Sequence, residues 1–151
     1  MADDVISGVY GSTGKVLSNR VEAQLSTLEP WTRHLAEEWL RYLQQYGVSY
    51  QITSTRRTFL EQLRLYRDWV TGKSKFPAAF PGRSRHENGT ALDVVFHNVR
   101  AEDAAELAPY FWLKWGGQRD PVHFELDCAA LDEQPSFFTT YRECHENPFI
   151  G

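Results

Sequence analysis

The chain has 151 residues, of which 42% are hydrophobic and 24% charged, a length and balance that suit one globular domain and exclude a disordered or membrane-spanning chain. The net charge of −4 hides an asymmetry, because residues 56–85 hold eight Lys and Arg against Glu61 and Asp68, or 8 − 2 = +6, which leaves −10 elsewhere. The overall acidity argues against a nucleic-acid partner. The basic segment favours a substrate that bears carboxylates, with a solvated helix face as the alternative.

The two ends of the chain carry weaker patterns. Residues 1–20 lack periodicity and are expected to form a partly ordered lead-in, so that residues 21–151 make up the domain. They also lack the charged-then-apolar architecture of a signal peptide. We therefore expect a protein made in the cytoplasm that reaches any target outside it after release or by another export route. Cys128 and Cys144 fit neither a disulfide framework nor a metal knuckle, so reduced thiols are the default and one bridge is the alternative.

Apolar periodicity predicts two helices in the first half of the chain. The first, residues 29–46, starts either with Pro30 in its first turn or with a capping box from Ser26 to Glu29. Its apolar stripe consists of Trp31, Leu35, Trp39, Leu43 and Tyr46. A half-buried strand is expected over residues 48–53. The second helix, residues 58–70, has an apolar stripe made of Phe59, Leu63, Tyr66 and Val70.

The second half alternates strands with short helices and loops. A long loop over residues 71–83 is of a kind that often frames a site. Strands are expected over residues 91–96, 111–115 and 122–126, and a short helix over residues 101–107 that stops near Pro109. The tail from residue 127 is expected to be an irregular cap with a short helix near 137–142. The pattern as a whole predicts one α+β domain.

Residues 84–93, Ser-Arg-His-Glu-Asn-Gly-Thr-Ala-Leu-Asp, carry the first candidate site. His86 lies in a loop and Asp93 opens an apolar strand, while Gly89 allows the turn that would bring the two side chains together. His123, in the later strand, is the candidate for a third ligand. Two histidines and one carboxylate form the ligand set of a catalytic zinc site, with one position left for water.

The residues around His123 supply a candidate base. Asp120 lies three positions earlier and Pro121 stiffens the link, so its carboxylate could take a proton from water and pass it to a leaving amine. Glu125, on the same strand face as His123, is the competing base or an anchor for the histidine. Of the other histidines, His34 and His97 are expected at the surface, and His145 has no partner at useful spacing.

One other enzyme class uses the same ligand types. Two histidines and a carboxylate hold iron in non-haem oxygenases. Those enzymes typically have one residue between the first histidine and the carboxylate, whereas six residues separate His86 from Asp93. The spacing therefore disfavours an iron oxygenase.

Two segments together resemble the signature of zinc D-alanyl-D-alanine carboxypeptidases and their relatives, the D,D-dipeptidases and the L-alanyl-D-glutamate endopeptidases of phage endolysins. They are Ser84-x-His86-x-x-Gly89-x-Ala91-x-Asp93 and Asp120-x-x-His123. Upstream, Thr55-Arg56-Arg57-Thr58-x-x-x-Gln62 resembles the family's arginine motif, with Arg56 in place of the usual aromatic residue. Trp115-Gly116-Gly117 also resembles the family.

The resemblance implies a small central antiparallel sheet flanked by helices, in a fold shared with the hedgehog signalling domain and the D,D-peptidases. It also implies one Zn²⁺ ion held by His86, Asp93 and His123, with Asp120 as general base. Further, it implies that Arg57 contacts the substrate's carboxylate or the carbonyl under attack, with Ser84 and Gln62 supporting the substrate or the motif.

The bond cut would be an amide in the peptidoglycan stem peptide, either L-Ala-D-Glu or D-Ala-D-Ala. The compact chain resembles a phage lysis enzyme, and we expect a monomer that binds neither nucleic acid nor membrane. The alternative is a non-catalytic zinc-containing domain of the same fold, of which the hedgehog domain is an example. The presence of both Asp120 and Arg57 argues against that alternative.

Overall fold

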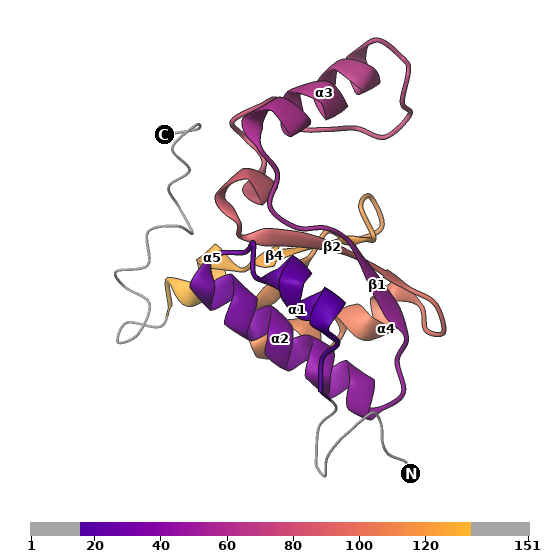
Figure 1. Cartoon of the computed structure of the whole chain (residues 1–151), viewed down its shortest axis with the longest axis vertical. Helices are drawn as coiled ribbons and strands as arrows, with labels where there is room; N and C mark the ends of the chain where they lie inside the picture. Colours follow the sequence, from indigo (N-terminus) through magenta and orange to yellow (C-terminus); the bar gives the residue numbers. More distant parts are fainter. Residues whose placement is uncertain (1–15, 134–151) are drawn as a thin grey trace.

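The computed structural model describes residues 16–133, in which helices surround one small antiparallel sheet (Figure 1). The sheet has the order β1-β2-β4-β3. Its strands are β1 (Tyr50–Ser54), β2 (Ala91–Phe96), β3 (Leu113–Trp115) and β4 (His123–Leu126). The helices are α1 (Asn19–Leu25), α2 (Pro30–Gln45), α3 (Phe59–Val70), α4 (Ala101–Ala105) and α5 (Cys128–Leu131), with 3-10 turns η1 (Arg85–Asn88) and η2 (Ala108–Phe111). The predicted α+β class with a small antiparallel sheet is confirmed.

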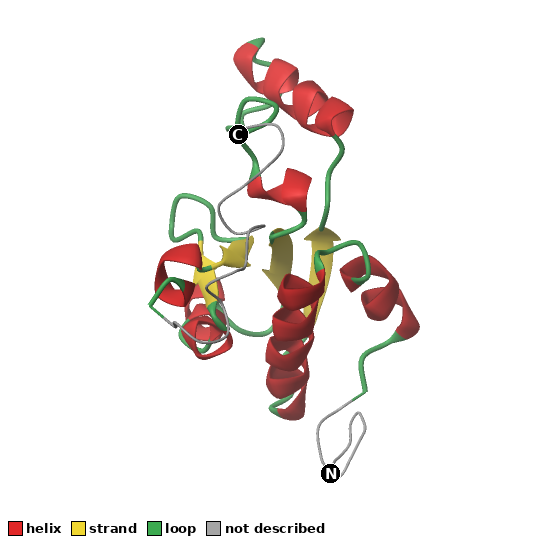
Figure 2. Cartoon of the chain, turned by 90° about the vertical axis from the view of Figure 1, so that its left-hand side faces the viewer, coloured by secondary structure: helices red, strands yellow, loops and turns green. Residues whose placement is uncertain are grey.

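The helix α2 covers one face of the sheet and closes the core (Figures 1 and 2). Trp39 is fully buried, and its ring lies 4.5 Å from that of Phe124 and 6.0 Å from that of Phe96. Because side chains alternate along a strand, residues 92, 94 and 124 share this buried face. Asp93 and His123 consequently lie on the opposite face, away from α2.

The predicted stripe of α2 is partly wrong. The helix buries Thr32, Ala36, Trp39, Leu40 and Leu43, whereas Tyr46 is 70% exposed. The core-facing side is therefore rotated toward smaller side chains, which let the helix approach the sheet. Pro30 occupies the first turn, and the Glu29 carboxylate caps the helix by accepting from the Trp31 amide and the Thr32 hydroxyl. The alternative capping box from Ser26 is excluded, since Ser26 ends α1.

Helix α3 is present as predicted, but its expected burial is wrong. Gln62, at 1% exposure, is the single buried residue of this helix, while Val70 is 54% exposed. Figure 1 shows α3 set off from the sheet and from α2. Tyr66 instead contacts Phe80 of the following loop, with 5.1 Å between ring centroids. The apolar periodicity thus reflects packing on residues 71–83 rather than on the core.

Several element limits also differ from the sequence prediction. The expected lead-in contains α1, which begins after Ser18, and Leu17 is already part of the core; residues 1–15 lie outside the described part. The strand predicted to start at residue 111 starts at Leu113, since Trp112 has a φ of 59°. Pro109 was expected to end the helical segment, but it lies in the first turn of the 3-10 helix η2.

The C-terminal prediction is only partly open to comparison. Helix α5, capped by Asp127, was not expected. Cys128 is disulfide-bonded, so the default expectation of a reduced thiol is wrong for this residue. Cys144 and the helix predicted near residues 137–142 lie outside the described residues. Between residues 16 and 133, the helices are too short or too polar to cross a membrane.

The η1 turn is fixed to the rest of the fold at Gly89. This residue has a φ of 80°, and its carbonyl accepts a hydrogen bond of 3.1 Å from the Glu29 amide. A Cβ at this position would collide with the Arg56 guanidinium and lie 2.9 Å from the Glu29 backbone nitrogen. Glycine is needed here both for its left-handed conformation and for the close approach of a second chain segment.

We predict that Gly89→Ala destabilises the protein more than Gly72→Ala does. Both positions have a φ of 80°, but nothing lies within 4 Å of a Cβ at Gly72. Gly72→Ala should therefore cost only the left-handed strain, about 1 kcal/mol. Gly89→Ala should cost about 3 kcal/mol in the free energy of unfolding, because overpacking adds to the strain. Urea unfolding of both variants checks this; equal losses would contradict the close packing at Gly89.

Candidate functional site

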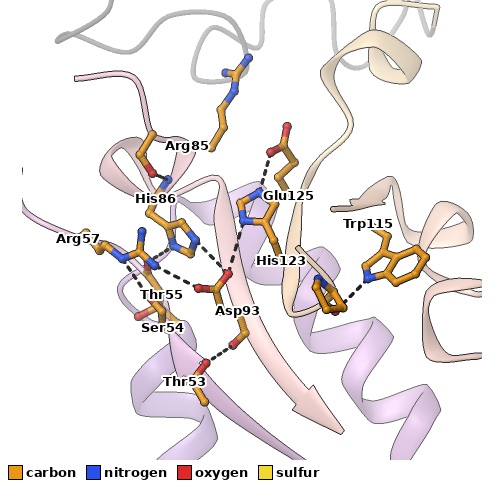
Figure 3. Close-up of polar contacts among 12 residues, drawn as sticks. Thr53, Ser54, Thr55, Arg57, Arg85, His86, Asp93, Trp115, His123 and Glu125 are labelled. Atoms are coloured by element: carbon orange, nitrogen blue, oxygen red, sulfur yellow. Dashed lines mark hydrogen bonds and ion pairs between the residues drawn. The ribbon is translucent and has the colours of Figure 1, made fainter. Parts of the chain in front are cut away.

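Three side chains from three elements converge on one point (Figure 3). His86 comes from η1, Asp93 from β2 and His123 from β4, and the last two are directly paired in the sheet. Asp93 Oδ1 lies 3.1 Å from His86 Nε2 and 3.4 Å from His123 Nδ1. One ligand atom from each residue lies within 4.8 Å of the other two. The structure thus brings together the three predicted ligands.

The far nitrogen of each ring is held by another group. His86 Nδ1 lies 2.7 Å from the carbonyl oxygen of Thr55, and His123 Nε2 lies 2.7 Å from Glu125 Oε1. In the neutral tautomers these nitrogens donate, which leaves His86 Nε2 and His123 Nδ1 with lone pairs directed at the common point. Such outer partners are a usual feature of metal-binding histidines. The donor set and its supports therefore fit a metal ion, and Glu125 is placed as an anchor of His123.

The second oxygen of Asp93 is held by Arg57. Arg57 Nη2 lies 3.1 Å from Asp93 Oδ2, and its other nitrogens donate to Ser54 Oγ at 3.2 Å and to Gln62 Oε1 at 3.1 Å. Gln62 is itself fixed, since its amide nitrogen donates to the Ala79 carbonyl at 2.9 Å. Gln62 therefore connects Arg57 to the loop after α3.

These contacts shift the pKa values of the site's side chains in the metal-free protein. Burial raises the pKa of the Asp93 carboxyl, but hydrogen bonds with His123 and His86 outweigh this and hold the pKa well below its usual range. For His123, burial lowers the pKa, and the stronger combined effect of Asp93 and Glu125 raises it to about 9. Burial also raises the pKa of Glu125, and its hydrogen bond to His123 brings the net shift downward.

A cleft of about 450 Å³ opens over this cluster. Asp120 and Arg57 line it, as do Ser84 and Gln62, so every predicted site residue borders the same cavity. Asp120 is exposed, and its backbone carbonyl accepts from the His123 amide at 3.1 Å, which fixes it at the start of β4. Ser84 is buried and its hydroxyl accepts from the His86 amide at 3.2 Å, so it supports the η1 turn.

Two residues that support the site were not identified from the sequence. The buried carboxylate of Glu87 accepts from the backbone nitrogens of Gly82 and Ser84, which shapes the turn that carries His86. Arg56 donates to the carbonyls of Thr27 at 2.9 Å and Asn88 at 3.2 Å. The sequence signal available for Glu87 was an acidic residue directly after His86. The partners of Arg56 are distant in sequence, so no local pattern indicated them.

The remaining histidines stand apart from the cluster. Within residues 16–133, the ligand atoms of His86, Asp93 and His123 are close enough together to hold a metal ion. Neither His34 nor His97 belongs to this group. His97 is exposed, as expected, at the end of β2. His34 is exposed, also as expected, and its ring lies 6.4 Å from that of Trp31. His145 lies outside the described residues.

The cleft thus holds a His-Asp-His cluster, an exposed carboxylate and an arginine, groups that metal-dependent hydrolases use. The chain belongs to the D-alanyl-D-alanine carboxypeptidase (VanY) family, whose model matches residues 26–134. The matched region contains all of the predicted site residues, and it identifies the chain as a peptidase of peptidoglycan peptides. No match was found among curated proteins.

Solved structures share the fold at low sequence identity. The vancomycin resistance D,D-pentapeptidase VanY from the VanB-type cassette, in complex with Zn(II), is 14% identical with a TM-score of 0.58, over 71% of this chain and 76% of that one. The L-Ala D-Glu endopeptidase ChiX of Serratia marcescens is 24% identical with a TM-score of 0.54, over 73% and 88%. The L,D-carboxypeptidase DacB of Streptococcus pneumoniae is 19% identical with a TM-score of 0.52, over 76% and 77%.

We predict that His123 makes the stability of the metal-free protein depend on pH. Its pKa is raised from 6.5 to about 9 on folding, so its stabilising contribution is complete below 6.5 and disappears as the pH rises through about 9. In the presence of a chelator, the free energy of unfolding of the parent should fall between about pH 7 and about pH 10 by more than that of His123→Gln. The exposed His97→Gln is the control and should follow the parent. An equal fall in all three proteins would contradict the protonated His123.

Proposed function

We propose that the chain is a zinc-dependent peptidase that hydrolyses an amide bond in the peptidoglycan stem peptide, as a phage-type cell-wall lysis enzyme. The observation that carries the proposal is the convergence of His86, Asp93 and His123 in a cleft that Asp120 and Arg57 also line. The family of the chain supports the substrate class. The zinc complex of the VanY neighbour supports the choice of metal.

His86, Asp93 and His123 would hold the ion. When bound, a zinc ion acts as a Lewis acid and lowers the pKa of a water molecule that it binds. Thr55 and Glu125 hold the two imidazoles in the tautomers that ligation requires. Arg57 holds Oδ2 of Asp93, which leaves Oδ1 on the side of the two histidines, where the ion would be held.

Asp120 would act as the general base. Its carboxylate lies on the exposed wall of the cleft, whereas Glu125 is occupied by His123. The Asp120 carboxylate can take the proton of the attacking water and then give it to the leaving amine. Asp120 and Glu125, which the sequence left as competing bases, would thus have different roles.

Arg57 would contact the substrate. Ser54, Gln62 and Asp93 occupy three of its five N–H groups, which leaves two for a substrate carboxylate or for the carbonyl under attack. Gln62 and Ser84 would act mainly by fixing Arg57 and the His86 turn, because both are buried. The other wall of the cleft is the loop after α3, including Phe76, Pro77 and Ala79. Its shape would select which stem bond enters.

We predict opposite metal phenotypes for two variants. Asp120→Ala should retain about one zinc per chain but lose cleavage of purified peptidoglycan by at least about 100-fold, because the base is absent while the ligands remain. His123→Ala should lose both zinc and cleavage. Metal analysis combined with release of new amino termini checks this. Cleavage by Asp120→Ala at the parent rate would exclude Asp120 as the base.

The products should identify the bond. We predict that mass analysis of digested peptidoglycan gives either free D-alanine, as from a D-Ala-D-Ala carboxypeptidase, or stems separated at L-Ala, as from an L-Ala-D-Glu endopeptidase. A chelator should abolish either product and added zinc should restore it. A zinc-loaded protein that releases no new termini would instead support the non-catalytic binding domain.

A further inference from the structure

A second cavity adjoins the cleft on the other side of Arg57. It has a volume of about 370 Å³ and lies between the end of β1 and helix α3. Arg57 and Leu65 line both cavities, so they form the boundary between them. A ligand that extends from the cleft past these two side chains therefore reaches the second cavity.

The second cavity is positively charged. Arg56, Arg57 and Arg64 line it, against one carboxylate, Glu61, so its charged side chains sum to 3 − 1 = +2. The Glu61 carboxylate is already engaged, since it accepts from the Thr58 amide at 2.8 Å in the capping box of α3. The hydrogen bond from Thr58, followed by the charges of Arg64 and Arg57, lowers the pKa of Glu61 and keeps this carboxylate ionised.

The three arginines differ in how many hydrogen bonds and ion pairs they form within the fold. Arg56 donates to the carbonyls of Thr27 and Asn88. Arg57 is held by Ser54, Gln62 and Asp93, as described above. Arg64 forms no ion pair within 4.0 Å among residues 16–133 and is exposed. Arg64 is therefore the guanidinium that is available to an incoming anion.

We propose that this cavity is a subsite for a second carboxylate of the substrate, one that does not contact the metal centre. The inference rests on the proposed function and narrows the substrate to stem peptides with a second free carboxylate. A guanidinium pairs with a carboxylate through two parallel hydrogen bonds, which gives preference for that group over a neutral amide. Arg64 supplies this pair, and Arg56 and Arg57 add a favourable field.

The test measures binding rather than turnover. Zinc-loaded full-length Asp120→Ala is titrated calorimetrically with two matched probes: the stem tetrapeptide L-Ala-γ-D-Glu-L-Lys-D-Ala with its glutamyl α-carboxylate free, and the same peptide with that carboxylate amidated. The free acid should bind about five- to tenfold more tightly, as expected for a charge-assisted pair at a partly exposed site. Adding Arg64→Gln should remove this difference with little effect on the amidated peptide.

Arg67→Gln is the matched control, because it removes the same charge from the same helix but borders neither cavity. It should keep the preference for the free acid. Loss of the preference in Arg67→Gln to the same extent, or its retention in Arg64→Gln, would overturn the subsite.

A parallel digestion of peptidoglycan by the parent separates the two proposals. Arg64-dependent discrimination without cleavage would support the subsite and reject the peptidase. Cleavage without such discrimination would reject the subsite alone.

Discussion

The site depends on the contacts that the Asp93 carboxylate makes. One of its oxygens lies within 3.4 Å of both His86 and His123, and the other is bonded to Arg57. A half-buried carboxylate would be costly on its own, and the three cationic or hydrogen-bonding partners offset that cost. Because β2 is an inner strand, hydrogen-bonded on both sides, Asp93 has little freedom to move. The two histidines of the candidate metal site and Arg57 are consequently positioned by one side chain.

The alternation of strand side chains divides the sheet into two functional faces. One face packs on α2 through Trp39 and Phe124, while the other presents the His-Asp-His cluster to the cleft. The core can thus be fully apolar without touching the chemistry. Substitutions at the two faces should accordingly affect different properties, stability in one case and metal or substrate binding in the other.

Much of the site could be predicted from the sequence because its ligands lie in short motifs with distinctive spacing. His86 and Asp93 lie seven positions apart in one motif, and Asp120 lies three positions before His123 in another. The strand β2 was predicted at its observed limits. The role of Arg56 could not be predicted, since its partners at Thr27 and Asn88 are brought close only by the complete fold. The burial of α3 was wrong for a related reason. Periodicity indicates an apolar side of a helix, but not which segment covers it.

The arrangement of α3 has a consequence for local stability. Helix α3 buries little besides Gln62, whereas the candidate ligands His123 and Asp93 belong to the central, fully paired part of the sheet. The free energy of local opening should therefore be low for the segment that carries Gln62 and the cleft wall, and high for these two strand residues. Slow amide exchange is expected in β2 and β4, as in the core helix α2, while α3 exchanges through small openings. For the proposed peptidase, such openings would let the cleft admit a bulky cross-linked substrate while His123 and Asp93 stay in place.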